Sequence, residues 1–152
     1  MVKEFGMPIT TIRDVIHRPL ELIVNSTFEQ DFVGWIALVV SIDTDYYHSC
    51  CKSCKFEAYG VLYQTFPVPI GVDWFTALYC WLRANAIGKG LRVIYHYSDG
   101  TQTSEDITVT TADTWQLKTL SPTPGKHMRG ITFDNPDALG YLVWLDDIYP
   151  IF

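Results

Sequence analysis

The chain has 152 residues and a net charge of −6 at pH 7, from 11 basic and 17 acidic residues. No run of basic residues occurs, which argues against a nucleic-acid partner because phosphate binding needs clustered Lys and Arg. No apolar run reaches the roughly 18 residues that a membrane-spanning helix needs. A chain of this length buries about 68–70% of its unfolded surface, so we expect one domain, which does not need disulfide bonds in order to fold.

The first 20 residues differ from the rest of the chain. In residues 10–16 a threonine cap followed by apolar residues at helical spacing predicts a turn or two of helix, which ends before Pro19. Because an apolar leader is poorly suited to water, this N-terminal extension either packs on its own domain or docks on a neighbouring subunit. It lacks the long apolar core of a signal peptide, so retention in the cell, processing and another export route all stay open.

Residues 21–152 form the expected folded domain. Short segments rich in β-branched and aromatic residues are separated by turn signals about every 8–12 residues, which is typical of antiparallel β-sandwiches. Asp99-Gly100 predicts a β-hairpin, and the prolines in 67–71 predict a further turn. The sequence therefore predicts an all-β jelly roll. Its expected strands are 20–24, 34–42, 50–56, 59–66, 73–84, 91–97, 101–110, 114–120, 128–133 and 140–149.

Two adjacent carboxylates, Asp146 and Asp147, lie inside the apolar last strand. Successive side chains of a strand point to opposite faces, so we expect one aspartate to face outward and the other to point the opposite way. A buried carboxylate needs a cation or several hydrogen-bond donors. If the first and last strands are neighbours, Glu29 and one of these aspartates could share a hard cation such as calcium. The alternative is that these carboxylates are solvated at the surface.

A second candidate site lies on the expected strand 73–84, where apolar residues alternate with Tyr79, Trp81 and Arg83. If this strand pairs with the following one, His96 joins the same face. Aromatic rings stack on the C–H faces of sugars, and Arg and His supply hydrogen bonds to hydroxyl groups. The sequence thus predicts a sugar platform, unless the N-terminal extension or another subunit covers this face. Three other tryptophans, Trp35, Trp115 and Trp144, are expected to pack in the core or at the edge of the sandwich.

The four cysteines are ambiguous. Cys51 and Cys54 have half of a zinc-site spacing, but no second pair follows, and Cys80 or His48 would have to complete it. A disulfide from Cys50, Cys51 or Cys54 to Cys80 is sterically easier than one between Cys51 and Cys54. Buried free thiols are the remaining alternative.

Catalysis has little support in the sequence. The four histidines are isolated, and no nucleophile-elbow, zinc-protease or phosphate-loop motif occurs. Glycoside hydrolysis needs two carboxyl groups that face one another across a cleft, which Asp146 and Asp147 cannot do as neighbours on one strand. We therefore predict that the protein is not an enzyme.

Several landmarks occur in a consistent order from about residue 22 to the end of the chain. The landmarks are Asn25-x-x-Phe28-Glu29, Gly34-Trp35, Gln64-Thr-Phe66-Pro-Val68, Trp81-Leu-Arg83-Ala84, Tyr97-Ser-Asp99-Gly100, Trp115 and Leu145-Asp146-Asp147-Ile148. With these landmarks the sequence resembles carbohydrate-binding modules of the galactose-binding-like jelly-roll fold. The resemblance implies a β-sandwich, a structural calcium ion between the first and last strands with Asp146 as the first-choice ligand, and often binding of a polysaccharide or other glycan outside the cell or at its surface. It also makes Asp43 and Asp45 weaker calcium candidates.

Two functions follow as expectations. The first is a calcium-stabilised, non-catalytic module that binds a glycan through the predicted platform. The second is a structural subunit that assembles into a homo-oligomer or polymer such as a filament, tube or shell, with the N-terminal extension closing an exposed sheet edge of a neighbour.

Overall fold

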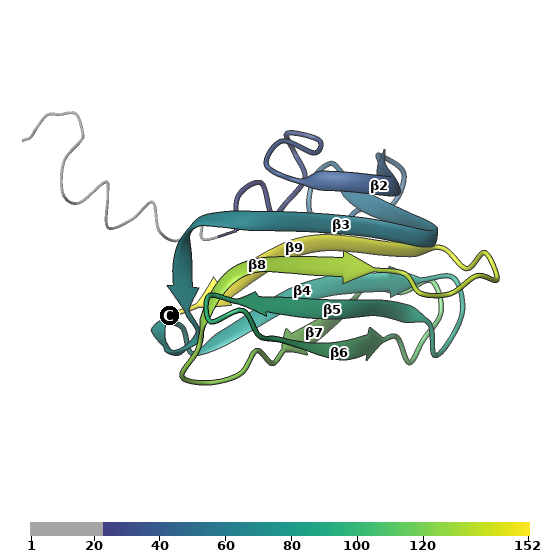
Figure 1. The fold of residues 1–152 in the computed structure, drawn as a ribbon. Coiled ribbons are helices and arrows are strands. Elements are labelled where there is room, and N and C mark those ends of the chain that lie inside the picture. The colour runs from purple at the N-terminus through teal and green to yellow at the C-terminus, as the bar shows by residue number, and fades with distance from the viewer. Residues whose placement is uncertain (1–22) are drawn as a thin grey trace, which may run out of the picture.

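The computed structural model describes residues 23–152 (Figure 1). The predicted N-terminal extension, its helical turn and the domain boundary after residue 20 lie outside these residues. Of the expected first strand, 20–24, only Ile23 and Val24 are described, and they lie in a bend and a turn. The strands that follow confirm the predicted all-β fold.

Eight antiparallel strands and one 3-10 turn are the regular elements of the described residues. They are β2 (Ile36–Asp43), β3 (Ser53–Gly71), η2 (Val72–Trp74), β4 (Ala77–Ala84), β5 (Gly90–Tyr97), β6 (Gln102–Thr108), β7 (Gln116–Leu120), β8 (His127–Asp134) and β9 (Val143–Ile151). The alternation of buried and more exposed residues expected of half-buried strands runs through the whole of β4 and β5, whereas β9 begins with four consecutive buried residues.

The long strand β3 joins the two layers of the sandwich. The strand order is β6-β5-β8-β3-β9-β4-β7, and β2 pairs with β3 off this path. The first part of β3, near Cys54, pairs with β9, whereas the later part, from Val61 onward, pairs with β8. In Figure 1, β2 lies above β3, with β9 and β8 below it. One layer therefore contains β9, β4 and β7, and the other contains β8, β5 and β6.

Strand β3 differs from the prediction, which placed two short strands and a turn over the same residues. Residues 67–71 belong to the strand, although Pro67 and Pro69 lack the N–H group that a ladder bond needs. The pairing of β3 with β8 shifts register between Thr65 and Ile70. This irregularity accommodates both prolines without ending the strand, which is why the expected turn does not form.

The core lies between the two layers. Every second residue of β4 and β5 is buried, with Leu82 and Val93 fully so. Leu62 of β3 and Leu145 of β9 complete the same cluster. The hairpin of β5 and β6 forms as predicted, with Gly100 at a φ of +87°, a conformation that favours glycine.

The segment before β2 is tied to the sandwich by side-chain amides. Gln64 accepts a hydrogen bond from the backbone N–H of Val24 at 2.8 Å and donates one to the Val24 carbonyl at 2.9 Å. The carbonyl of Asn25 accepts the indole N–H of Trp35 at 3.1 Å. These contacts explain why polar landmark residues lie among apolar ones: they fix a turn that carries Phe28 into the core.

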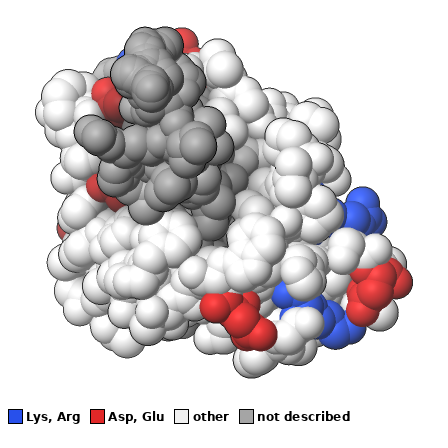
Figure 2. Space-filling view, turned by 90° about the vertical axis from the view of Figure 1, so that its left-hand side faces the viewer, with Lys and Arg blue, Asp and Glu red and all other residues white. Residues whose placement is uncertain are grey.

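Charges at the end of the sandwich near the C-terminus are mixed. Figure 2 views this end, and basic and acidic side chains lie next to one another there on a mostly uncharged visible surface. Elsewhere in the described residues, ion pairs such as that of Lys126 with Asp99, at 2.7 Å, also balance charge locally. The visible surface at this end thus carries no large field of a single sign.

Among residues 23–152, no helix is long and apolar enough to cross a membrane.

Candidate functional site

The outer face of β4 carries three of the four predicted sugar-contact residues. Leu78 and Leu82 point into the core, and Tyr79, Trp81 and Arg83 point outward. This division follows the alternation that the sequence predicted. The outward residues lie opposite residues of β9 and β7, the strands on either side of β4.

A histidine from the loop between β2 and β3 lies on this face. The ring of His48 stacks on Trp81, with ring centroids 3.8 Å apart and planes inclined by 14°. Trp115 meets the same histidine edge-on at 6.1 Å. The sequence predicted the open face of Trp81 as a sugar plate, but His48 covers it. His48 and Trp81 are far apart in the sequence and meet only because the fold brings loop 44–52 onto this face. The position of His48 in the sequence therefore did not indicate the contact.

A second pair of rings continues the face. Tyr79 of β4 and Tyr149 of β9 are paired across the strands, with ring centroids 5.8 Å apart. We call the five rings on this face the aromatic strip. Its members are Tyr149, Tyr79, Trp81, His48 and Trp115.

Arg83 is held by protein contacts. Its Nη1 donates to the carbonyl oxygen of Asp113 at 2.7 Å, and its guanidinium lies over the ring of Tyr46 at 4.3 Å. Its side chain is only 14% exposed. Arg83 therefore stabilises the loops beside the strip, and its guanidinium has little surface left for a ligand.

His96 lies in the other layer. Strands β4 and β5 do not pair, because β8, β3 and β9 separate them in the sheet order. His96 shares a hydrogen bond of 2.8 Å with Thr132 and meets Tyr63 edge-on at 5.7 Å. Burial, together with the positive charge of Arg129, lowers the pKa of His96. The predicted convergence of His96 with Trp81 was wrong, since consecutive strands of a sandwich can belong to opposite layers.

Asp146 and Asp147 point to the same side of β9, contrary to the simple alternation. The pairing of β4 with β9 shifts register between Tyr79 and Trp81, and Asp147 has a φ of +48°. This irregularity is a β-bulge, which places an extra residue opposite one partner and re-aims its side chain. Both carboxylates consequently face loop 44–52.

Loop 44–52 supplies donors to both aspartates. The Oδ2 of Asp146 accepts the backbone N–H groups of His48 and Ser49 at 3.0 and 3.2 Å, and its Oδ1 accepts the N–H of Asp147 at 2.8 Å. Asp147 accepts the Ser49 hydroxyl at 2.7 Å, and its other oxygen lies 2.6 Å from Nδ1 of His48. The histidine that stacks on Trp81 is thereby fixed at its backbone and at its ring.

Asp146 has no exposed surface, although it lies on the outer face of the sheet opposite Trp81. Loop 44–52 covers it. Burial and the adjacent charge of Asp147 raise the pKa of Asp146 to about 7. The three hydrogen bonds to its carboxylate favour the charged form and lower the pKa, but they do not outweigh these two effects. Its negative charge is therefore only partly compensated.

Glu29 reaches the same loop from the segment before β2. Its carboxylate accepts the backbone N–H groups of Cys51 at 2.7 Å and Lys52 at 3.1 Å. The partly compensated charge and the carboxylate oxygens of Glu29, Asp146 and Asp147 are the kind of ligands that a hard cation prefers. Their geometry does not fit a cation, because these oxygens face N–H groups. Residues 23–152 also contain no group of three or more acidic, histidine or cysteine side chains placed to hold a metal. Calcium thus stays a prediction.

Asp43, the last residue of β2, lies immediately before loop 44–52. Its carboxylate accepts the indole N–H of Trp144 at 2.7 Å and the backbone N–H of Asp45 at 2.7 Å. Burial favours the neutral form, but the hydrogen bonds outweigh it and lower the pKa of Asp43. Asp43 therefore orders the loop. Trp144 and Trp35 are buried, as predicted for tryptophans that pack in the sandwich.

The cysteines follow none of the favoured pairings. The structure pairs Cys50 with Cys51, while Cys54 and Cys80 are buried free thiols. The bridge to Cys80 that the sequence left open does not form, whereas the alternative of buried free thiols holds for Cys54 and Cys80, and burial raises the pKa of both. These thiols are core side chains on β3 and β4.

The sequence matches no protein-family profile and no curated protein. Solved structures do match. A family 16 carbohydrate-binding module is 22% identical with a TM-score of 0.65, covering 86% of this chain and 99% of its own. A family 61 module solved with β-1,4-galactotriose is 17% identical with a TM-score of 0.59, covering 86% and 97%.

A third match comes from a different kind of protein. The enzymatically active domain of a tailspike protein from bacteriophage CBA120 is 12% identical with a TM-score of 0.61, and the match covers 87% of this chain but only 21% of that one. Identities this low establish the architecture alone. The chain has the β-sandwich fold of carbohydrate-binding modules.

Proposed function

We propose that this protein is a non-catalytic module that binds a polysaccharide or another glycan through the aromatic strip. The observation that carries the proposal is the row of rings on the outer face of β4 and β9, in which Tyr79 lies next to Tyr149 and His48 lies on Trp81. Rings presented on a rigid sheet suit the C–H faces of sugars, and fixed side chains lose little entropy on binding. One structural neighbour was solved with β-1,4-galactotriose, and another, which joins a family 22 module to a family 10 xylanase module, was solved with xylohexaose.

The non-catalytic part of the proposal rests on the contacts of the histidines. His48 is held by Asp147 and Trp81, and His96 is held by Thr132. His127 packs edge-on against Trp74.

A module of this kind binds glycans outside the cell or at its surface, so we also propose that location.

The test is retention of the full-length protein on a panel of immobilised polysaccharides. Replacing both Tyr79 and Tyr149 with Ala is expected to weaken binding at least about tenfold, because two stacking contacts are removed. Tyr59→Ala is the matched control, since Tyr59 is an exposed tyrosine outside the strip. Equal retention of the double variant and the control would reject the strip as the binding surface.

Calcium remains in the proposal on the ground of charge. Glu29, Asp146 and Asp147 bring three carboxylates to one loop, and a cation that binds only the folded state would stabilise it. The melting temperature should then fall in chelator and recover when calcium is added back. An identical melting temperature in both conditions would mean that the N–H donors of loop 44–52 suffice.

The edge strand β2 favours self-assembly as a second candidate function. Among the described strands, β2 pairs only with β3, and Ile36, Leu38 and Val39 are exposed on it. An exposed apolar edge is a template for pairing with another chain. Light scattering tests this: Leu38→Lys and deletion of residues 1–20 should each leave a folded monomer. Large particles formed equally by both variants would reject this second function.

A further inference from the structure

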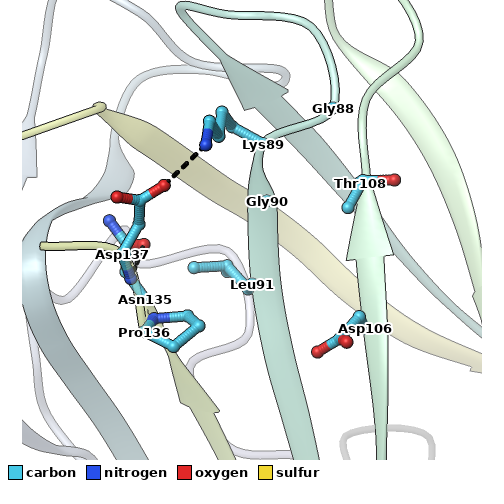
Figure 3. A pocket seen from close by; sticks show the side chains of 9 residues that line it. All are labelled: Gly88, Lys89, Gly90, Leu91, Asp106, Thr108, Asn135, Pro136 and Asp137. Atoms are coloured by element: carbon cyan, nitrogen blue, oxygen red, sulfur yellow. Dashed lines mark hydrogen bonds and ion pairs between the residues drawn. The ribbon is translucent and has the colours of Figure 1, made fainter. Parts of the chain in front are cut away.

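A polar pocket lies at one end of the sandwich, on elements other than those that carry the aromatic strip. It is formed by the start of β5, the end of β6 and the loop between β8 and β9, and its cavity volume is about 210 Å³. Figure 3 shows Lys89 and Asp137 on one side and Thr108 and Asp106 of β6 on the other, with Gly90 between them.

The walls of this pocket are held rigidly. Lys89 and Asp137 form an ion pair at 2.8 Å across one side. The buried side chain of Asn135 donates to the carbonyls of Glu57 and Tyr141, both at 3.2 Å, and accepts the backbone N–H of Asp137 at 3.2 Å. A binding site needs such support, because walls that are already ordered lose little entropy when a ligand enters.

Two glycines belong to the lining of the pocket. Gly88 has a φ of +79°, a backbone conformation that favours glycine, and a Cβ on it would meet open space. Gly90 packs so closely on the backbone of Ile107 that any Cβ would clash with its carbonyl. Glycine at position 90 therefore holds β5 tightly to β6 beside the pocket.

Several polar groups in the pocket remain available for a ligand. Within residues 23–152, the side chain of Asp106 makes no hydrogen bond or ion pair, and Arg92, opposite it on β5, instead contacts Asp134 at 3.2 Å. The hydroxyl of Thr108 has no partner within the same residues, and both side chains are exposed. Lys89 keeps donors beyond the one used by Asp137.

The available groups define the ligand class. The ionised side chains of the lining sum to about one negative charge, from one lysine and two aspartates, so an anion is disfavoured. The carboxylate of Asp106 can accept hydrogen bonds from hydroxyl groups, the ammonium of Lys89 can donate them to hydroxyl oxygens, and Leu91 with Pro136 offers apolar contact. The volume is below the roughly 300 Å³ at which pockets for drug-sized ligands begin.

We propose that this pocket is a second glycan site, which takes a single neutral sugar ring end-on, with Asp106 and Thr108 as its hydroxyl-binding residues. The aromatic strip runs over an open sheet face and suits the side of a chain, whereas the pocket accepts only a terminal unit. This inference rests on the proposed glycan binding for its ligand class alone.

The experiment is a titration of ¹⁵N-labelled full-length protein with D-glucose, D-galactose, D-mannose and D-xylose, followed by amide chemical shifts. At least one sugar should move the amides of Gly88, Gly90 and Thr108 saturably. Asp106→Ala should weaken that binding about tenfold, since a hydrogen bond to a charged acceptor is lost, and Thr108→Val should weaken it less. Glu57→Ala is the matched control, because Glu57 is an exposed carboxylate outside the pocket whose side chain makes no hydrogen bond within the described residues.

The outcomes separate this inference from the proposed function. Shifts confined to the strip amides, or pocket shifts equal in Asp106→Ala and Glu57→Ala, overturn the pocket and leave the strip intact. Pocket shifts that persist in the Tyr79/Tyr149 double variant support the pocket even if that variant keeps full retention on polysaccharide. If no sugar of the panel moves the pocket amides, the pocket is overturned, and polysaccharide retention still decides the strip.

Discussion

The two outer faces of the sandwich include β4 and β5, two strands with the same alternation of buried and outward residues, yet the faces differ in chemistry. On the face of β4 and β9, Tyr79 and Trp81 present rings, and loop 44–52 lies over Asp146. On the face of β5 and β8, the outward residues satisfy one another, as Arg92 does with Asp134 and His96 with Thr132.

The difference teaches how a sheet face becomes a binding surface. On the face of β5 and β8, charged and polar side chains pair with one another within the sheet. Large rings leave apolar area that water does not satisfy, and a loop can anchor there through its backbone. A carboxylate such as Asp146 can then be buried outside the core, because the loop supplies N–H groups to it.

The largest effect is expected at the buried carboxylate. Asp146→Ala leaves the backbone N–H groups of His48, Ser49 and Asp147 without their acceptor, and the cost should be about 3 kcal/mol of unfolding free energy. Urea unfolding measures it. On the other face, Asp134→Ala should cost less than about 1 kcal/mol, since its partner Arg92 is exposed. Equal costs would contradict the contrast between the two faces.

The next largest effect concerns the ring that supports the strip. Trp81→Ala removes one ring and the surface on which His48 rests, so glycan affinity should fall about thirtyfold, or about 2 kcal/mol. Calorimetry with the best polysaccharide of the panel measures it. Trp74→Ala, an exposed tryptophan outside the strip, is the control and should bind normally. Comparable losses in both variants would show that the effect is not specific to the strip.

A smaller effect is expected for His48→Ala. This change uncovers the face of Trp81, which can then contact the sugar itself, so affinity should stay within about threefold of the parent. Stability should fall by about 1 kcal/mol, because the contact with Asp147 is lost. A loss of affinity as large as that of Trp81→Ala would instead identify His48 as the ring that contacts the glycan.

The smallest effect on binding is expected at His96. His96→Ala should leave glycan affinity unchanged within about twofold, as it lies in the other layer. Because its folded-state pKa is lowered, the unfolded chain takes up its proton first, and stability falls as pH drops below the unfolded pKa near 6.5. Thermal unfolding between neutral and mildly acidic pH should show a smaller decrease for the variant. A steeper decrease would reverse the inferred sign.

Local patterns predicted the parts of the site that lie on one strand. The alternation in β4 placed Tyr79, Trp81 and Arg83 outward, and Asp99-Gly100 predicted the hairpin, because both depend on neighbours in sequence. The bulge at Asp147 was not predictable in this way. It depends on the pairing of β9 with β4, which reverses the direction that alternation assigns to a single side chain.

The sequence by itself determined the all-β class, most strand positions and the alternation of buried and outward residues along strands such as β4 and β5, since these follow from side-chain periodicity. Only the tertiary structure decided that β4 and β5 lie in opposite layers, that His48 covers Trp81, and that one loop serves Glu29 and both aspartates. The physical reason is that these contacts join segments up to about 100 residues apart, whose meeting depends on sheet order and on the free energy of the whole packed fold.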